Sequence, residues 1–437
     1  MRHRFPLPLL DIAIIPMAVL SAVGCSSDKG TDATDSSSSS AVFSSSGPAY
    51  GTPEYWEKQW QESLAYFNCP QPIDTIDGWK LAGLRTGVSF GEPDSNMVMQ
   101  IREHNGTLVV RTYRGDMWRA HYPELEWSAI SLPDGEPVKK LHTQGDSIFA
   151  TTSKKAELWT AKFPDLEWRR LSPPQEELRT HPSSETRLAG SAAYQRGDTL
   201  FFGVLEVTDL DSTGEDWGDF NEERIYAKID GSWRQTAAIT EYSDNALQDG
   251  LWKFAEVRDA LFAITYSQGV WAWSGGVWRK FPFPESTPEA AYLGSFRDIA
   301  EWNGEVWLLD LRGWIGSSSN LSEWTDRNLY RDWAGDDAKS LGTPHMFHPY
   351  DGKLLVGTSG GVKQWSETEG RWLSITVNDC REKKATRAPR TSYTGWGPPG
   401  LVHEFVILGD TIVAGVADYN TGLSGVYMFD LKEATWR

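Results

Sequence analysis

The chain has 437 residues and a formal net charge of −18 at pH 7, which suits either two or three ordinary domains or one large repeat domain. The acidic balance disfavours nucleic acid and anionic lipid surfaces as partners, because a phosphate-binding face needs clustered Lys and Arg. Tryptophan and glycine are abundant, with 22 and 40 residues, and in a mostly polar chain this indicates many short strands joined by tight turns.

Residues 1–24 have the layout of an export signal. A basic start is followed by an apolar run over residues 12–23, which is too short to span a bilayer, and the small Gly24 precedes Cys25. The segment resembles a bacterial lipoprotein signal. This resemblance implies cleavage before Cys25, a lipid such as palmitate on that residue, and anchoring in the cell envelope, at the outer membrane or cell surface rather than the inner membrane. Ala22 replaces the Leu that this family prefers, so an ordinary signal peptide or an uncleaved anchor is the alternative.

Two segments separate this signal from the repeats. Residues 25–47 are rich in Ser and carry too little apolar surface to fold, which predicts a disordered tether. In the lead-in segment, residues 48–77, Thr52-Pro53-Glu54 combines a capping hydroxyl, a Pro at the first helical position and an acid in the first turn. Aromatic residues then recur at helical spacing, so we predict a helix over about residues 53–67 that docks on the main domain.

A two-residue turn followed by a β-rich run recurs seven times. The turn pairs are Asn105-Gly106, Gly145-Asp146, Gly197-Asp198, Arg258-Asp259, Asn303-Gly304, Asp351-Gly352 and Gly409-Asp410. Asn, Asp and Gly tolerate the positive φ angles of hairpin turns, which predicts a β-hairpin at each position. The pair Arg258-Asp259 lacks Gly, and we expect it to turn differently.

After each turn comes a further strand and then a Trp that opens the last strand of the unit. These residues are Trp127, Trp168, Trp233, Trp278, Trp324, Trp372 and Trp436. With a strand before each turn, a unit has about four strands in ~40–50 residues, which is the period of a β-propeller blade. We expect these Trp side chains to fill the space between blades.

The repeat form resembles that of secreted bacterial β-propellers. The predicted fold is therefore all-β: a seven-bladed β-propeller of four-stranded blades over residues 78–437, preceded by the short helix. The chain stops at Trp436-Arg437, where the other copies continue, and residues 78–84 look like an additional Trp strand. We expect residues 78–84 to complete the seventh blade and so to join the two ends of the ring.

The remaining cysteines suggest a cross-link. With Cys25 lipidated, Cys69 and Cys380 are left over, and outside the cytosol two leftover cysteines usually pair. The repeat order places both near the junction of the sixth and seventh blades. We therefore predict a Cys69–Cys380 disulfide.

Three tryptophans fall off the repeat register, in predicted loops: Trp217, Trp333 and Trp396. Loops at one end of a ring are free to vary and carry binding sites, and an exposed Trp can stack on a sugar or pack on a partner. We take these three as candidate ligand-binding residues, with local packing as the alternative. The pair His345 and His348 is expected to point to opposite faces of a strand and to bind no metal.

The insertion in the third blade begins like a calcium loop. Asp209, Asp211, Thr213 and Asp216 are the candidate metal ligands, because oxygen side chains alternate there. Phe220 stands where a calcium loop has its closing Glu, so a solvated acidic loop is the alternative. Calcium is the one cofactor that the sequence suggests.

No catalytic residue is predicted. Ser359 lies in a GxSxG pattern, but that pattern requires a strand-to-helix turn and residues 362–365 continue as a strand. We therefore favour a membrane-anchored binding or scaffolding propeller with a protein or carbohydrate partner. The alternative is a carbohydrate-active enzyme, a hydrolase or lyase, which is motivated by the loop tryptophans and the many acids and requires two close carboxylates in a cleft.

Overall fold

The structure is a computed structural model. It describes residues 75–76, 79–86, 97–178, 186–208, 220–241, 250–265, 268–281, 296–310, 313–327, 344–358, 361–376, 401–418 and 423–436. The chain divides into two units, Met1–Tyr55 and Trp56–Arg437, and every described residue belongs to the second. The predicted signal peptide, the tether, the helix over residues 53–67 and both Cys69 and Cys380 lie outside the described residues.

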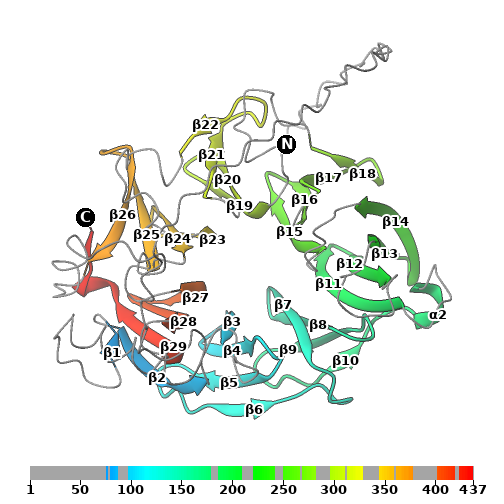
Figure 1. Ribbon diagram of the computed structural model, residues 1–437, viewed down its shortest axis with the longest axis horizontal. Coiled ribbons are helices and arrows are strands. Elements are labelled where there is room, and N and C mark those ends of the chain that lie inside the picture. The colour runs from blue at the N-terminus through cyan, green and yellow to red at the C-terminus, as the bar shows by residue number, and fades with distance from the viewer. Residues whose placement is uncertain are drawn as a thin grey trace, which may run out of the picture. The chain divides into compact units, whose positions relative to one another are not determined.

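Seven antiparallel sheets, which we call blades, follow one another along the chain (Figure 1). Blade one holds β3 (Val98–His104), β4 (Thr107–Thr112), β5 (Met117–His121) and β6 (Ser128–Ile130). Blade two holds β7 (Val138–Gln144), β8 (Ser147–Thr152), β9 (Leu158–Lys162) and β10 (Arg169–Arg170). Blade three holds β11 (Thr186–Arg196), β12 (Thr199–Thr208), β13 (Phe220–Ile229) and β14 (Ser232–Glu241). Blade four holds β15 (Leu251–Val257), β16 (Ala260–Thr265), β17 (Val270–Ser274) and β18 (Val277–Lys280).

The last three blades continue the pattern. Blade five holds β19 (Phe296–Trp302), β20 (Glu305–Asp310), β21 (Ile315–Ser318) and β22 (Thr325–Asp326). Blade six holds β23 (Pro344–Tyr350), β24 (Lys353–Thr358), β25 (Gly361–Ser366) and β26 (Arg371–Thr376). Blade seven holds β27 (Leu401–Leu408), β28 (Thr411–Asp418) and β29 (Leu423–Asp430). The first strand of each blade contacts those of its two neighbours, and β27 contacts β3, so the ring closes. The fold is a seven-bladed β-propeller, as predicted.

The N-terminal side of the propeller completes blade seven. Strand β2 (Trp79–Thr86) pairs with β29 as the fourth strand, and β1 (Thr75–Ile76) pairs with β2. This confirms the expected closure. The assignment of Trp436 to blade seven was wrong, because β30 (Thr435–Trp436) pairs with β26 at the outer edge of blade six. Since β2 already occupies the edge of β29, the C-terminal strand extends the edge of the neighbouring blade.

All seven predicted turns connect the first and second strands of their blades. The expectation that Arg258-Asp259 turns differently was wrong. Their φ angles are 51° and 61°, close to the 49° of Asn105 and the 79° of Gly106 in blade one. The Arg258 guanidinium donates hydrogen bonds to the carbonyl oxygens of Gly304 and Ser319 in blade five. We infer that these contacts offset the cost of a left-handed conformation without Gly.

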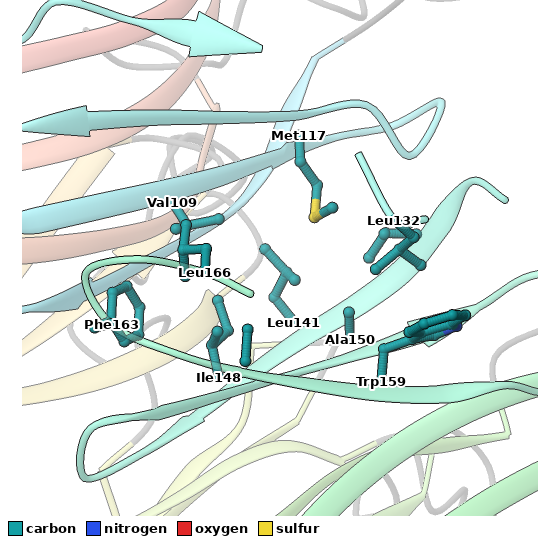
Figure 2. Packing of buried hydrophobic residues seen from close by; sticks show 11 residues of the cluster. Val109, Met117, Leu132, Leu141, Ile148, Ala150, Trp159, Phe163 and Leu166 are labelled. Carbon is teal, nitrogen blue, oxygen red and sulfur yellow. The ribbon is translucent and has the colours of Figure 1, made fainter. Parts of the chain in front are cut away.

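The described residues form seven hydrophobic core clusters, and each lies between two neighbouring blades. Figure 2 shows the cluster between blades one and two, where Val109 and Met117 face Leu141 and Trp159. Several of the repeat tryptophans also donate a hydrogen bond to the preceding blade in the ring. The indole N–H groups of Trp127, Trp278 and Trp372 donate to Ala82 O, Thr236 Oγ1 and Arg327 O at 2.6, 3.2 and 2.9 Å. The described Trp residues therefore join blades, as expected.

Helix is scarce in the described part of the chain. It consists of α2 (Gln175–Leu178) and a 3-10 turn, η2 (Leu431–Glu433). None of the described helices is long and apolar enough to cross a membrane.

Candidate functional site: a cationic central channel

Each of the seven first strands carries one extra residue at the same place. In β3, Val98 pairs with Thr112 and Gln100 pairs with Arg111, so Met99 is left without a partner in the ladder. The same shift occurs at Val138/Lys140, Gly190/Ala193, Leu251/Lys253, Phe296/Asp298, Pro344/Met346 and Val402/Phe405. Such a β-bulge bends its strand and changes the direction of the following side chains.

The bulge places two consecutive residues between two core positions. In β3, Val98 and Ile101 are buried and the two residues between them are half-buried. The seven equivalent bulge pairs are Met99-Gln100, Lys139-Lys140, Ser191-Ala192, Trp252-Lys253, Arg297-Asp298, His345-Met346 and His403-Glu404. Six of these pairs line a cavity of about 940 Å³ at the centre of the ring, which we call the central channel. Ser191 and Ala192 are buried instead.

The described walls of the channel have the opposite charge to the whole chain. They include seven basic side chains: Arg102, Arg111, Arg114, Lys139, Lys140, Lys253 and Arg297. They include three acidic ones, Glu103, Asp298 and Glu404, which leaves an excess of four positive charges. The net charge of the chain is −18. The acidic composition of the whole chain therefore does not exclude anionic partners at this surface.

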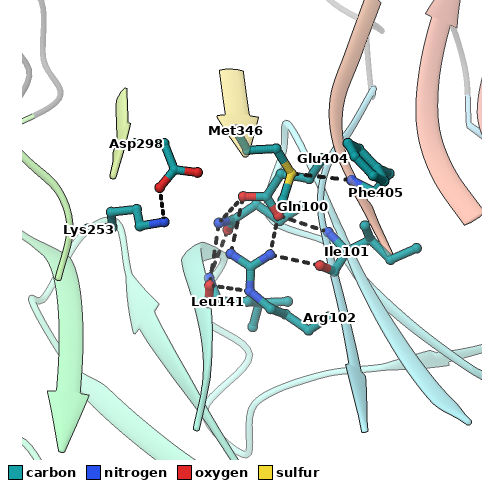
Figure 3. A network of polar contacts seen from close by, with 9 residues as sticks. All are labelled: Gln100, Ile101, Arg102, Leu141, Lys253, Asp298, Met346, Glu404 and Phe405. Atoms are coloured by element: carbon teal, nitrogen blue, oxygen red, sulfur yellow. Dashed lines mark hydrogen bonds and ion pairs between the residues drawn. The ribbon is translucent and has the colours of Figure 1, made fainter. Parts of the chain in front are cut away.

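A carboxylate joins blade seven to blade one (Figure 3). Glu404 forms an ion pair with Arg102 and accepts a hydrogen bond from the backbone N–H of Ile101 at 3.2 Å. Gln100 repeats this contact one blade further, because its Oε1 accepts from the backbone N–H of Leu141 at 2.8 Å. A bulge disrupts the ladder, and the side chain of the preceding blade supplies the acceptor that the backbone N–H requires.

Blades five, six and seven use the same contact. Asp298 Oδ2 accepts from the backbone N–H of Phe347 at 2.7 Å, and Met346 Sδ lies 3.4 Å from the backbone N of Phe405. Asp298 also pairs with Lys253 of blade four. Asp298 and Glu404 are therefore each occupied by a cation and by backbone donors. This arrangement suits a rigid wall better than a pair of catalytic carboxylates.

Blade four contributes an aromatic side chain to the cationic wall. The Arg297 guanidinium lies 3.7 Å and the Lys140 ammonium 4.4 Å from the centre of the Trp252 ring. Lys140 Nζ also donates to the carbonyl oxygens of Leu251 and Trp252 at 2.9 and 3.2 Å. Lys140 thus extends from blade two to blade four, past the small Ser191-Ala192 pair. Cation–π contacts of this kind fix the position of the charges.

Four of the chain's eight histidines line the channel. Burial, assisted by nearby cations such as Arg102, holds the pKa of His142 well below its usual range. Burial lowers the pKa of His348 to about 4 and, with Arg297 and Arg111, that of His403 to about 3. Burial, His403 and Arg297 hold the pKa of His345 well below its usual range. These imidazoles are therefore neutral at pH 7.

A buried carboxyl lies behind the channel wall in blade three. Burial raises the pKa of Glu223 to about 7, although the Ser191 hydroxyl donates to Glu223 Oε1 and both Lys139 and Lys140 lie nearby. Space for this carboxyl comes from Gly203, where an added Cβ would lie 2.7 Å from Glu223 Oε1.

Every ligand-binding, lipidation, disulfide and metal residue predicted from the sequence lies outside the described residues. These are Cys25, Cys69, Cys380, Asp209, Asp211, Thr213, Asp216, Trp217, Trp333 and Trp396. Among the residues that the structure does describe, no group of three or more His, Cys, Asp or Glu could hold a metal ion.

The expectation that His345 and His348 face opposite sides was wrong, because both line the channel. The bulge between Pro344 and Met346 adds a residue and so changes the phase of the strand. A signal for the bulge pairs is present in the sequence: two residues, polar in most blades, stand between two apolar ones a few positions before each turn. Strict alternation does not predict that pattern.

No family model matches this chain. No curated protein matches it either. Solved structures with a similar arrangement include the WD40 β-propeller domain of Doa1, with 10% identity and a TM-score of 0.48 over 82% of this chain and 99% of that one. The computationally designed Ika8 protein has 12% identity and a TM-score of 0.45 over 80% of this chain and 100% of that one. YCF48 with a bound peptide has 11% identity and a TM-score of 0.46 over 83% of this chain and 97% of that one. The fold assignment rests on the strand pairing described above.

Proposed function

We propose that this chain is an extracytoplasmic binding protein whose propeller takes up an anionic ligand in its central channel. The observation that supports this is the excess of four positive charges among the described channel residues of a protein with net charge −18. A cleft with an excess of one sign of charge raises the local concentration of oppositely charged ligands. A volume of about 940 Å³ is large enough for a small polyanion or a short segment of an acidic chain.

A binding role is preferred to catalysis because of how the carboxylates are used. Glu404 is paired with Arg102, and Asp298 is paired with Lys253. Both also accept backbone hydrogen bonds. A carbohydrate-active enzyme would require a carboxylate free to exchange a proton with its substrate. No described contact favours that alternative over binding.

The binding test uses the full-length chain in detergent and isothermal titration calorimetry. The probes are inorganic tripolyphosphate and an oligogalacturonide, with a neutral maltooligosaccharide as the control. We expect both anions, and not the neutral sugar, to bind at 50 mM salt, with affinity falling steeply towards 300 mM. Lys139→Gln should weaken binding several-fold, whereas Lys162→Gln, on an exposed strand of blade two, should not. Equal binding of the neutral sugar, or no binding of either anion, would contradict the proposal.

We also propose that the protein is held at the membrane by a lipid on Cys25. The support is the basic and apolar segment before Gly24-Cys25, followed by the Ser-rich residues 25–47. Metabolic labelling with a palmitate analogue tests this directly. Label should appear on the wild-type chain and be absent from Cys25→Ser, whereas labelling of both variants would disprove the assignment.

A further inference from the structure

Three successive blades place their first bulge residue in a row along the channel wall. Arg297 comes from blade five, His345 from blade six and His403 from blade seven. The two imidazole rings lie 4.7 Å apart, centre to centre. All three residues line the channel. The bulges therefore bring together residues more than 100 positions apart in the chain.

The His403 imidazole of this group carries a buried polar atom. His403 Nε2 is buried and has no hydrogen-bond partner among the residues that the structure describes. A buried nitrogen of this kind costs stability unless something else satisfies it. An oxygen of an anionic ligand that reaches this atom from the channel would accept a hydrogen bond from an Nε2–H group, and Arg297 would supply a charge partner.

We propose that Arg297, His345 and His403 form a subsite that binds one carboxylate or phosphate group of the channel ligand, and that binding there is coupled to the uptake of a proton by the histidine pair. This inference rests on the proposed function, because it specifies where and how the anion binds. Guanidinium groups match the geometry of both oxyanions, so the two chemistries share the site.

The coupling follows from the charges that face the pair. On β27 the neighbouring carboxylate is Glu404, and it is held by Arg102 of β3. On β19 the acid beside Arg297 is Asp298, and it is held by Lys253.

The other groups near the pair are Arg111 of β4 and His348 of β23. Arg111 and Arg297 disfavour a charge on His403. A bound anion opposes their effect and stabilises the imidazolium. By thermodynamic linkage, the ligand should bind more tightly as the pH falls.

The test is calorimetry of the full-length chain with one carboxylate probe, tartrate, and one phosphate probe, inorganic pyrophosphate, in two buffers of different ionisation enthalpy. We expect up to one proton to be taken up per bound tartrate at pH 6.5. The affinity for tartrate should rise up to tenfold per pH unit as the pH falls from 8 to 6. Tartrate is fully ionised in this range, so any proton taken up belongs to the protein, whereas pyrophosphate itself titrates there.

Variants test whether the histidine pair, His345 and His403, takes up the proton. His403→Asn and His345→Asn should lose proton uptake and the pH dependence, whereas His348→Asn, whose ring packs against Phe405 and is not part of the pair, should keep both. If wild-type protein binds tartrate without proton uptake, the subsite inference is wrong and the proposed function stands. If proton uptake persists in both variants of the pair, the inference is also wrong. If no anion binds at all, both proposals fail.

Discussion

The carboxylate of Glu404 in blade seven accepts a hydrogen bond from the backbone N–H of Ile101 in blade one, at 3.2 Å. Their separation of 303 positions makes this contact a direct link across the closure of the ring. The Glu404 side chain is only 17% exposed and also pairs with Arg102. One side chain thus accepts the hydrogen bond of a backbone N–H beside a bulge, pairs with a channel cation and joins the two ends of the propeller.

Glu404→Ala should therefore destabilise the protein strongly. Removing it leaves the Arg102 charge without its carboxylate partner and the Ile101 N–H without its acceptor, and breaking such a pair costs about 3–5 kcal/mol. Urea unfolding at pH 7.5 measures the change. The matched control is Glu369→Ala, which breaks an exposed pair with Arg371 and should cost about 0–1 kcal/mol. Similar losses for the two variants would refute the structural role given to Glu404.

The Arg258 side chain should hold its unusual turn in place. Arg258→Ala removes hydrogen bonds to Gly304 and Ser319 of blade five and an ion pair to Glu301. We expect a loss of about 1–3 kcal/mol in the free energy of unfolding, because bonds from a charged donor are lost. Arg279→Ala, on an exposed position of β18, serves as the control and should change stability little. If Arg258→Ala leaves the free energy of unfolding unchanged, the turn needs no such support.

The buried histidines should make the protein less stable in acid. The pKa of His348 is about 4 in the native state, against an ordinary value of 6.5. Between these values the unfolded chain binds a proton that the native chain does not, so stability present above pH 6.5 is lost as the pH falls towards 4. For His348 alone the full effect is on the order of 3 kcal/mol. Urea midpoints at pH 7.5, 6 and 5 measure it, and His348→Asn should give the flatter profile.

Glu223 should produce the opposite trend. Burial raises its pKa to about 7 from 4.5, so the native state keeps a proton that the unfolded chain releases. The stability from this group is full below pH 4.5 and is lost as the pH rises through 7. Glu223→Gln retains an acceptor for Ser191 and removes the titration, so it should gain stability relative to wild type between pH 5 and 8. Parallel pH profiles for the two proteins would contradict the assignment.

The blades could be predicted because their signals are local. A turn pair such as Asn105-Gly106 permits positive φ within two residues. In most blades a Trp, such as Trp372, follows the turn by a similar number of residues. These features predicted the number of blades and the closing role of the strand that starts at Trp79. Trp436 was assigned to the wrong blade because its sequence context does not indicate which of two neighbouring blades has an outer strand edge that can accept another strand.

The channel depended on the tertiary structure for two physical reasons. A β-bulge shifts the phase of a strand by one residue, so alternation placed His345 and His348 on opposite faces when both line the channel. Closure of the ring then gathers single residues from blades far apart in sequence, as it does with Lys140 and Arg297 around Trp252. The sequence alone determined a seven-bladed ring with an acidic net charge. Only the packing of the blades decided that the described wall of its centre is cationic.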